Sequence, residues 1–136
     1  MDKEDNRLIY LDSSVLIDYY RKLNKEKSFF NFLLNNYKLF SVSVITQFEI
    51  YTGADTIRKA FWDDFFINII IEPYTSPLIF TSILIERELK IKRKSIDFKD
   101  LAIAATALHF HEPFATLNAK HFISIDGLEV IIPKPK

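Results

Sequence analysis

Hydrophobic residues along the chain follow two patterns, short continuous runs and longer stretches of helical period. Short apolar runs are typical of buried strands, and apolar residues spaced three and four positions apart are typical of helices. The first pattern predicts strands over 8–11, 39–42, 67–71, 113–116 and 128–132. The second predicts helices over 13–22, 25–36, 43–52, 57–66, 75–92 and 98–111.

The alternation of strand and helix predicts an α/β fold. We expect a three-layer α/β/α arrangement around a mostly parallel five-stranded sheet. Two glycines, five prolines and the absence of repeats leave no linker in the sequence. We therefore expect one domain over 1–136, with its folded unit between residues 7 and 133. Ligands of such sheets bind beyond the carboxyl ends of the strands, where Asp12 and Asn118 follow apolar runs.

Composition limits the possible chemistry. The chain has no cysteine, which excludes disulfides, zinc–thiolate sites and cysteine nucleophiles, so any metal must be bound by oxygen or imidazole. Eighteen basic residues balance eighteen acidic ones, and this balance neither indicates nor excludes a nucleic-acid substrate. A polar start and the lack of an apolar run of about 20 residues predict a cytoplasmic protein without a membrane segment.

Three acidic residues are the main candidates for chemistry. Asp12 ends the first predicted strand, although capping of the next helix would also explain an aspartate there. Asp18, inside that helix, is expected to face solvent. Glu49 lies in the third predicted helix, which begins after Ser43 as N-cap and stops at Gly53.

The other two candidates border predicted apolar stripes. The stripe beside Glu49 consists of Val44, Phe48 and Tyr51, and a surface glutamate is the alternative interpretation. The stripe beside Asp100 is narrow and consists of Leu101, Ala104, Ala105 and Leu108. Asp97 precedes Asp100 by three residues, and capping would account for it as well as catalysis would.

Together, Asp12, Glu49 and Asp100 indicate a metal site. Each lies at the edge of apolar surface, where an unpaired carboxylate is costly. A shared hard cation removes that cost, and Mg²⁺ in particular is held by few carboxylates, several waters and substrate phosphate.

Four segments resemble, in order, the sequence blocks of the PIN-domain family, and more narrowly its VapC-type toxins. The segments are IYLDSSVLIDYY, SVITQFEIYTGA, DLAIAATAL and PFATLNAKHFISIDGLEVIIP. The resemblance implies a Mg²⁺- or Mn²⁺-dependent endoribonuclease with Asp12, Glu49 and Asp100 as metal ligands. It also implies an antitoxin partner that inserts into the site or covers it.

The fourth segment departs from the family pattern. Many members have an aspartate two residues after the threonine or directly before the phenylalanine, where this chain has Asn118 and His121. We therefore expect one tightly held metal ion. Asn118 either hydrogen-bonds the attacking water or a phosphate oxygen, or serves as a turn residue. Whether Asp97, His121 or Asp126 takes part stays open.

Basic and aromatic residues suggest where RNA and proteins bind. Two basic groups, Arg21 with Lys22 and the cluster Lys90, Lys92, Arg93 and Lys94, lie along an RNA path or are solvated helix ends. An aromatic set, consisting of Tyr19, Tyr20, Phe61, Trp62 and Phe65, is expected to form an exposed patch for a homodimer or an antitoxin helix.

Three other function classes compete with the nuclease. A PIN-like domain without catalysis would bind RNA or a protein, and the missing fourth acid favours it. A receiver-like domain would use Asp12 as a phosphoacceptor, but no lysine ends a late strand as that chemistry requires. A flavodoxin-like module lacks a glycine-rich phosphate loop.

Overall fold

The computed structural model describes residues 7–134, which form helices around one five-stranded sheet. The strands are β1 (Leu8–Leu11), β2 (Leu39–Ser43), β3 (Ile70–Glu72), β4 (Phe114–Ala115) and β5 (Val130–Ile131). Their order is β3-β2-β1-β4-β5, and every neighbouring pair is parallel. The predicted α/β class is confirmed, with a sheet that is wholly parallel among the described strands. Since β1 is the central strand, Asp12 follows the middle of the sheet.

Six α-helices within residues 7–134 connect and cover the strands. They are α1 (Ser13–Arg21), α2 (Phe29–Leu34), α3 (Val44–Thr52), α4 (Thr56–Phe65), α5 (Ser76–Ile91) and α6 (Phe98–His109). Short 3-10 turns occur at η2 (Lys25–Lys27), η3 (Phe66–Asn68) and η4 (Ala119–His121).

Two predicted elements need correction. The helix expected over 25–36 is divided, because Ser28 has extended backbone angles and its hydroxyl accepts the N–H of Asn31 at 3.1 Å, so α2 begins after it. The strand expected over 67–71 begins only at Ile70, because residues 66–68 form η3.

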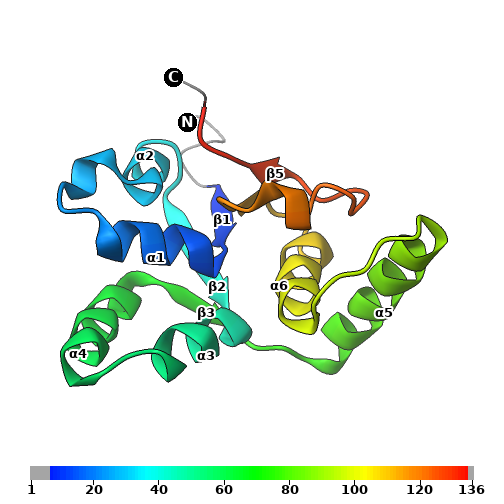
Figure 1. Ribbon diagram of the computed structural model, residues 1–136, viewed down its shortest axis with the longest axis horizontal. Helices are drawn as coiled ribbons and strands as arrows, with labels where there is room; N and C mark the ends of the chain where they lie inside the picture. The colour runs from blue at the N-terminus through cyan, green and yellow to red at the C-terminus, as the bar shows by residue number, and fades with distance from the viewer. Residues whose placement is uncertain (1–6, 135–136) are drawn as a thin grey trace.

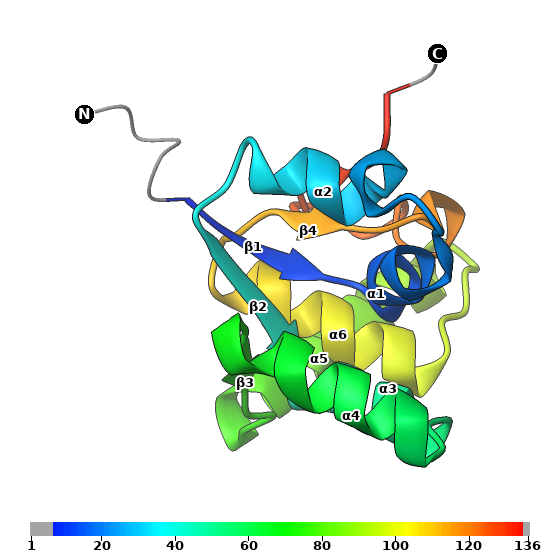
Figure 2. The same ribbon diagram turned by 90° about the vertical axis from the view of Figure 1, so that its left-hand side faces the viewer.

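The sheet separates two helical layers (Figure 1). Ile9 and Leu11 of β1 face a core built with α1, α2 and α4, while Tyr10 faces the opposite core built with α5 and α6. Helix α3 contributes to both cores, Ile50 to the first and Ile45 to the second. Figure 2 shows β1 and β2 running in the same direction, with α1 and α3 following at their arrowhead ends. The end of the sheet that carries Asp12 is therefore flanked by both helices.

Helix α6 is buried on all sides rather than along a narrow stripe. Every residue from Leu101 to Ala107 is buried, because α6 lies between the sheet and α5. Its four alanines take little space in this middle layer. Thr106 is satisfied within the helix, donating its hydroxyl to the carbonyl of Ala102 at 2.8 Å.

The predicted exposed aromatic patch is wrong. The five rings join α1 to α4 inside the first core, where Trp62 is buried and the others are partly buried. Tyr20 of α1 and Phe61 of α4, for example, meet edge to face with centroids 4.9 Å apart. Large apolar side chains are exposed instead on the outer face of α5, at Ile79, Phe80, Ile83 and Leu84. No helix within residues 7–134 is long and apolar enough to span a bilayer.

Candidate active site

Asp12 lies at the carboxyl end of β1 and is held by two hydroxyl groups. Its side chain is only 3% exposed, and its Oδ2 accepts hydrogen bonds from Ser14 Oγ at 2.8 Å and Thr116 Oγ1 at 2.7 Å. Asp12 occupies the N-cap position of α1, yet its side chain makes no capping hydrogen bond. The capping interpretation is therefore wrong for this carboxylate, which the hydroxyls hold in a fixed orientation.

Both hydroxyl groups are themselves fixed by backbone amides. Ser14 Oγ accepts the N–H of Leu117 at 3.0 Å, and Thr116 Oγ1 accepts the N–H of Asn118 at 2.9 Å. A hydroxyl has one proton, so each hydroxyl donates that proton to Asp12 and accepts a hydrogen bond from a backbone N–H. The network links the ends of β1 and β4 across 104 positions of sequence. Sequence reasoning assigned no role to Ser14 or Thr116; the available signal was a hydroxyl residue beside each strand end.

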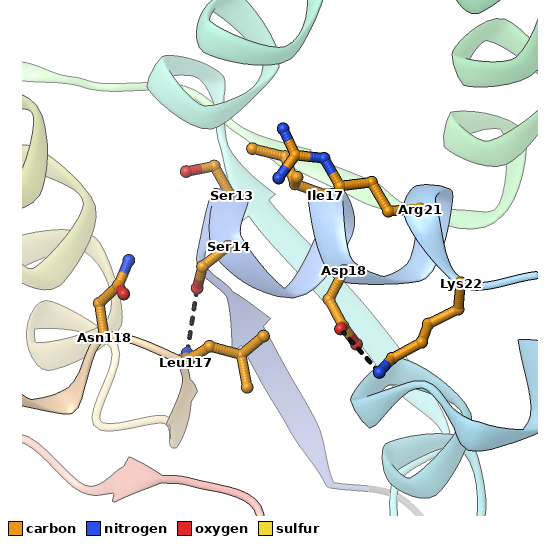
Figure 3. Close-up of a pocket in the computed structure, with 8 residues that line it drawn as sticks. All are labelled: Ser13, Ser14, Ile17, Asp18, Arg21, Lys22, Leu117 and Asn118. Carbon is orange, nitrogen blue, oxygen red and sulfur yellow. Dashed lines mark hydrogen bonds and ion pairs between the residues drawn. The ribbon is translucent and has the colours of Figure 1, made fainter.

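Asn118 occupies the predicted turn position, and its side chain lines a pocket. Its carbonyl accepts the N–H of His121 at 3.0 Å, so its backbone begins the turn η4 as a turn residue would. Its side chain lines a pocket together with Ser13 and Ser14 (Figure 3). The structure thus places Asn118 beside the Asp12 network, and its chemical role stays a prediction.

Glu49 is partly buried on α3 and is poorly satisfied. Its Oε1 is buried with no hydrogen-bond partner among the described residues. Burial raises the pKa of Glu49, and the negative charges of Asp12, Asp100 and Asp97 raise it further, against the opposing effect of Lys99. The charges of the other acids therefore act in the same direction as burial on the pKa of Glu49.

The predicted apolar face of α3 is wrong at Phe48, whereas Tyr51 packs against the first core as expected. Thr46 and Ile50 are its buried residues, whereas Phe48 is 59% exposed. Apolar side chains occur on both sides of this helix, so the sequence could not indicate which side faces the core. Glu49 is itself partly buried on this helix, and its carboxylate is partly desolvated.

Asp100 lies in the first turn of α6 and is bound by His121. Asp100 Oδ2 and His121 Nδ1 are 3.0 Å apart. Burial raises the pKa of Asp100, the bond from His121 opposes this, and the charges of Asp12 and Asp97 add to the rise. His121, at a position where many family members have an aspartate, therefore reaches the site as a partner of Asp100.

The remaining acidic residues lie in different surroundings. Asp97 is exposed at the N-cap position of α6, and its side chain makes no capping hydrogen bond, so the capping interpretation of Asp97 is wrong. Asp97 lines a pocket of about 590 Å³ together with Asp100 and His121. Asp126 makes an exposed ion pair with Lys92 at 2.8 Å. Its carboxylate is therefore paired with a cation on the surface, apart from Asp12, Glu49 and Asp100. Asp18 is not simply solvent-facing, because its Oδ2 accepts the N–H of Phe29 at 3.1 Å.

The carboxylates suit a hydrated hard cation. Within residues 7–134 no three His, Asp or Glu side chains are close enough to form a ready-made coordination shell. Mg²⁺ keeps several of its waters and binds few carboxylates directly, so it does not need such a shell. The unpartnered Oε1 of Glu49 and the raised pKa values of Glu49 and Asp100 are the features that a cation would relieve.

Some of the predicted basic residues are paired with acids on the surface, and others line pockets near the candidate site. Lys90 pairs with Glu86 at 3.2 Å, and Lys92 pairs with Asp126, so both are engaged on the surface. Lys94 lines the same pocket as Asp100. Arg21, at the end of α1, lines the pocket that contains Ser14 and Asn118.

The sequence of this chain is similar to that of a known protein family. Residues 9–128 match the family model described as PIN domain. The chain is 32% identical over 127 residues to Ribonuclease VapC1 of Methanocaldococcus jannaschii, an alignment that covers 90% of this chain and 83% of that protein.

Solved structures with the same fold come from toxin–antitoxin complexes. A chain of DNA-bound VapBC from Salmonella typhimurium superposes with a TM-score of 0.82 and 21% identity, covering 93% of this chain and 98% of that one. A chain of VapBC2 from Rickettsia felis, bound to a promoter DNA fragment, gives 0.81 and 20%, covering 93% and 99%. At these identities the likeness concerns the fold.

Proposed function

This chain belongs to the PIN domain family, and from that membership we propose that it is a divalent-metal-dependent endoribonuclease, the toxin of a toxin–antitoxin pair. Asp12, Glu49 and Asp100 hold the metal, and Asn118 assists catalysis. The observation that carries the proposal is the group of acids at the carboxyl end of the sheet, in which Glu49 Oε1 is buried without a partner. A stable fold gains nothing from such a group unless a cation binds it.

The residues divide the work of the reaction. A bound divalent ion lowers the pKa of water and offsets charge on the phosphodiester. Asp12 presents a carboxylate whose Oδ2 is fixed by Ser14 and Thr116, so its orientation is set before substrate arrives. Glu49 and Asp100 supply the further negative charge that attracts the ion. The Asn118 amide hydrogen-bonds the attacking water or a phosphate oxygen.

We propose Mg²⁺ or Mn²⁺ as the ion, with one ion held tightly. Oxygen ligands suit both metals. His121 stands where a further acid is common in the family, and its ring is bound to Asp100. A neutral or cationic imidazole adds no negative charge, so a second ion would bind only with help from an RNA phosphate.

A cleavage assay tests the proposal directly. Purified protein is incubated with labelled RNA in Mg²⁺, in Mn²⁺ and in EDTA, beside the Asp12→Asn variant. We expect internal cleavage with either metal and none in EDTA or with the variant. Cleavage that persists unchanged in EDTA would overturn the metal-dependent reaction.

One alternative has a specific observation in its favour. The lack of a ready-made three-ligand group in residues 7–134, together with the His121–Asp100 bond, suits a PIN-like domain that binds RNA or a protein without cutting. RNA binding with no cleavage at millimolar Mn²⁺ would favour it, and Asp12-dependent cleavage would eliminate it.

We also propose an antitoxin and a second copy of the chain as partners, in the cytoplasm where the RNA substrate is found. Helix α5 buries Leu78, Ile85 and Leu89 on one face yet exposes Phe80 and Leu84 on the other. An apolar outer face of this kind usually marks an interface. If α5 forms the homodimer, Phe80→Glu with Leu84→Glu will give a monomer in light scattering while RNA cleavage per site persists.

A further inference from the structure

A pocket of about 550 Å³ opens between α1 and the chain segment that follows β4 (Figure 3). Its lining includes Ser14, Ile17, Arg21, Leu117 and Asn118. Ser14 is also a hydrogen-bond donor to Asp12, and the N–H of Asn118 reaches Thr116. The pocket therefore shares residues with the Asp12 network, and its volume is in the range of small-molecule sites.

The charges in this pocket leave one cation uncompensated. Asp18 and Lys22 pair with each other at 3.8 Å, and Asp18 also accepts the N–H of Phe29. Arg21 makes no hydrogen bond or ion pair with any residue of the described chain, 7–134, and in Figure 3 its guanidinium lies beside Ile17, apart from that pair. Arg21 also lines a second pocket, of about 310 Å³, that includes Glu49. A free guanidinium thus lies between two pockets that border the acidic site.

The rest of the lining suits the other parts of a nucleotide. Ile17 and Leu117 are 37% and 39% exposed, and Figure 3 shows them on opposite sides of the pocket. Two aliphatic side chains in the lining of one pocket offer apolar contact to a ribose or a base. The Asn118 amide provides both a donor and acceptors for polar edges.

We propose that this pocket binds one nucleotide of the RNA next to the cleaved phosphodiester, with Arg21 on its phosphate. The inference rests on the proposed ribonuclease function and names the substrate contact that function needs. An acidic catalytic centre repels RNA, so a nearby free cation is required to hold the strand. Guanidinium binds phosphate in a two-pronged geometry that lysine cannot reproduce.

RNA is favoured over a protein segment by the position of the pocket. It lies beside the residues that hold Asp12, where the substrate must pass. An acidic antitoxin segment could also meet Arg21, and it is an outcome of the test below.

Binding of a fluorescent single-stranded RNA oligonucleotide in EDTA tests the proposal without cleavage. We expect Arg21→Ala to raise Kd about tenfold and to lower the salt dependence of log K by about 0.7, the contribution of one lost contact to single-stranded nucleic acid. Arg21→Lys should keep the salt dependence but recover only part of the affinity. Lys27→Ala is the matched control, an exposed cation outside the described pockets, and should change Kd less than about twofold.

Cleavage kinetics give a second readout. Loss of Arg21 should raise KM while leaving kcat nearly unchanged, because the contact holds substrate equally before and during the reaction. Arg21 is exposed at the end of α1, so circular dichroism should show the variant folded.

The outcomes separate this inference from the proposed function. Arg21-dependent RNA binding without any cleavage supports the pocket and removes the ribonuclease proposal. Asp12-dependent cleavage with RNA binding that is unchanged in Arg21→Ala overturns the pocket. So does a variant that binds RNA normally but loses binding of an acidic antitoxin peptide.

Discussion

Asp12 and Glu49 are both proposed metal ligands, but the fold surrounds their carboxylates differently. Asp12 is buried and fully oriented, with two hydroxyl donors on Oδ2. Glu49 is partly buried, its Oε1 has no partner within the described chain, and its pKa is raised. The fold thus sets the position of the first acid, whereas the second is held at a cost in stability. A functional site often contains such a group, because ligand binding stabilises it.

Among the substitutions considered, replacement of Asp12 should have the largest effect on RNA cleavage. Asp12→Asn keeps an oxygen that can accept both hydroxyl bonds but removes the charge, so the fold should survive. We expect RNA cleavage to fall by more than about a hundredfold, a larger loss than removal of a supporting partner gives. Single-turnover cleavage in saturating Mn²⁺ measures the loss, and thermal melting checks the fold.

The matched control for Asp12 is Asp126→Asn. Asp126 is exposed and paired with Lys92, so cleavage should stay within about twofold of the wild type. Near-normal activity of Asp12→Asn, or equal losses in both variants, would contradict the assignment of Asp12.

Thr116→Val should weaken the hydrogen bonding that orients Asp12. The variant removes a donor to Asp12 and an acceptor for the Asn118 N–H in a buried position. We expect the free energy of unfolding to drop by about 1.5–3 kcal/mol, the range for hydrogen bonds to charged groups. Cleavage should fall by about tenfold or more. Urea unfolding and cleavage kinetics measure the two effects.

Thr116→Ser controls for shape in this experiment. It keeps the hydroxyl and removes only a methyl group, so most activity should return. If Val and Ser variants behave alike, the hydroxyl does not orient Asp12.

Glu49→Gln should act in opposite directions on stability and on metal binding. The amide removes a desolvated charge from among three other acids, so the metal-free variant should melt at a higher temperature than the wild type. Mn²⁺ affinity should fall about tenfold in calorimetry. Unchanged affinity would remove Glu49 from the metal site.

The smallest expected effect is a pH dependence of metal-free stability. Burial raises the pKa values of Glu49 and Asp100, so the folded protein binds their protons more readily than the unfolded chain does. Their destabilising effect is present at neutral pH and is relieved as pH falls through the raised values toward about 4. We expect the melting temperature of Glu49→Gln to exceed that of the wild type at pH 7 and to converge with it near pH 4. A constant difference across this range would be inconsistent with the raised pKa of Glu49.

The sequence predicted the sheet well because strand signals are local. The run 8–11 matches β1 residue for residue, and Asp12 and Asp100 lie at the predicted strand end and helix start. The one-domain prediction over 1–136 and the chemical roles of the acids stay predictions. The errors at 25–36 and on α3 arose where a local pattern admitted two solutions, a capping serine inside a helical run and apolar residues on both faces of one helix.

Contacts between distant residues could not be read from the sequence. Thr116 and His121 belong to the fourth segment, and only folding brings them to Asp12 and Asp100. No periodicity encodes which hydroxyl meets which carboxylate. The sequence also could not show that Arg21 lacks a partner within residues 7–134. Arg21 lacks one because the neighbouring Asp18 pairs with Lys22 instead.

The bond between Thr116 and Asp12 also joins two segments that are synthesised at different times. Strand β4 lies more than a hundred residues after β1 along the chain, so it leaves the ribosome later. A nascent chain therefore carries Asp12 before the partner that orients it is present. If Asp12 acts as proposed, products that end before β4 should lack ribonuclease activity.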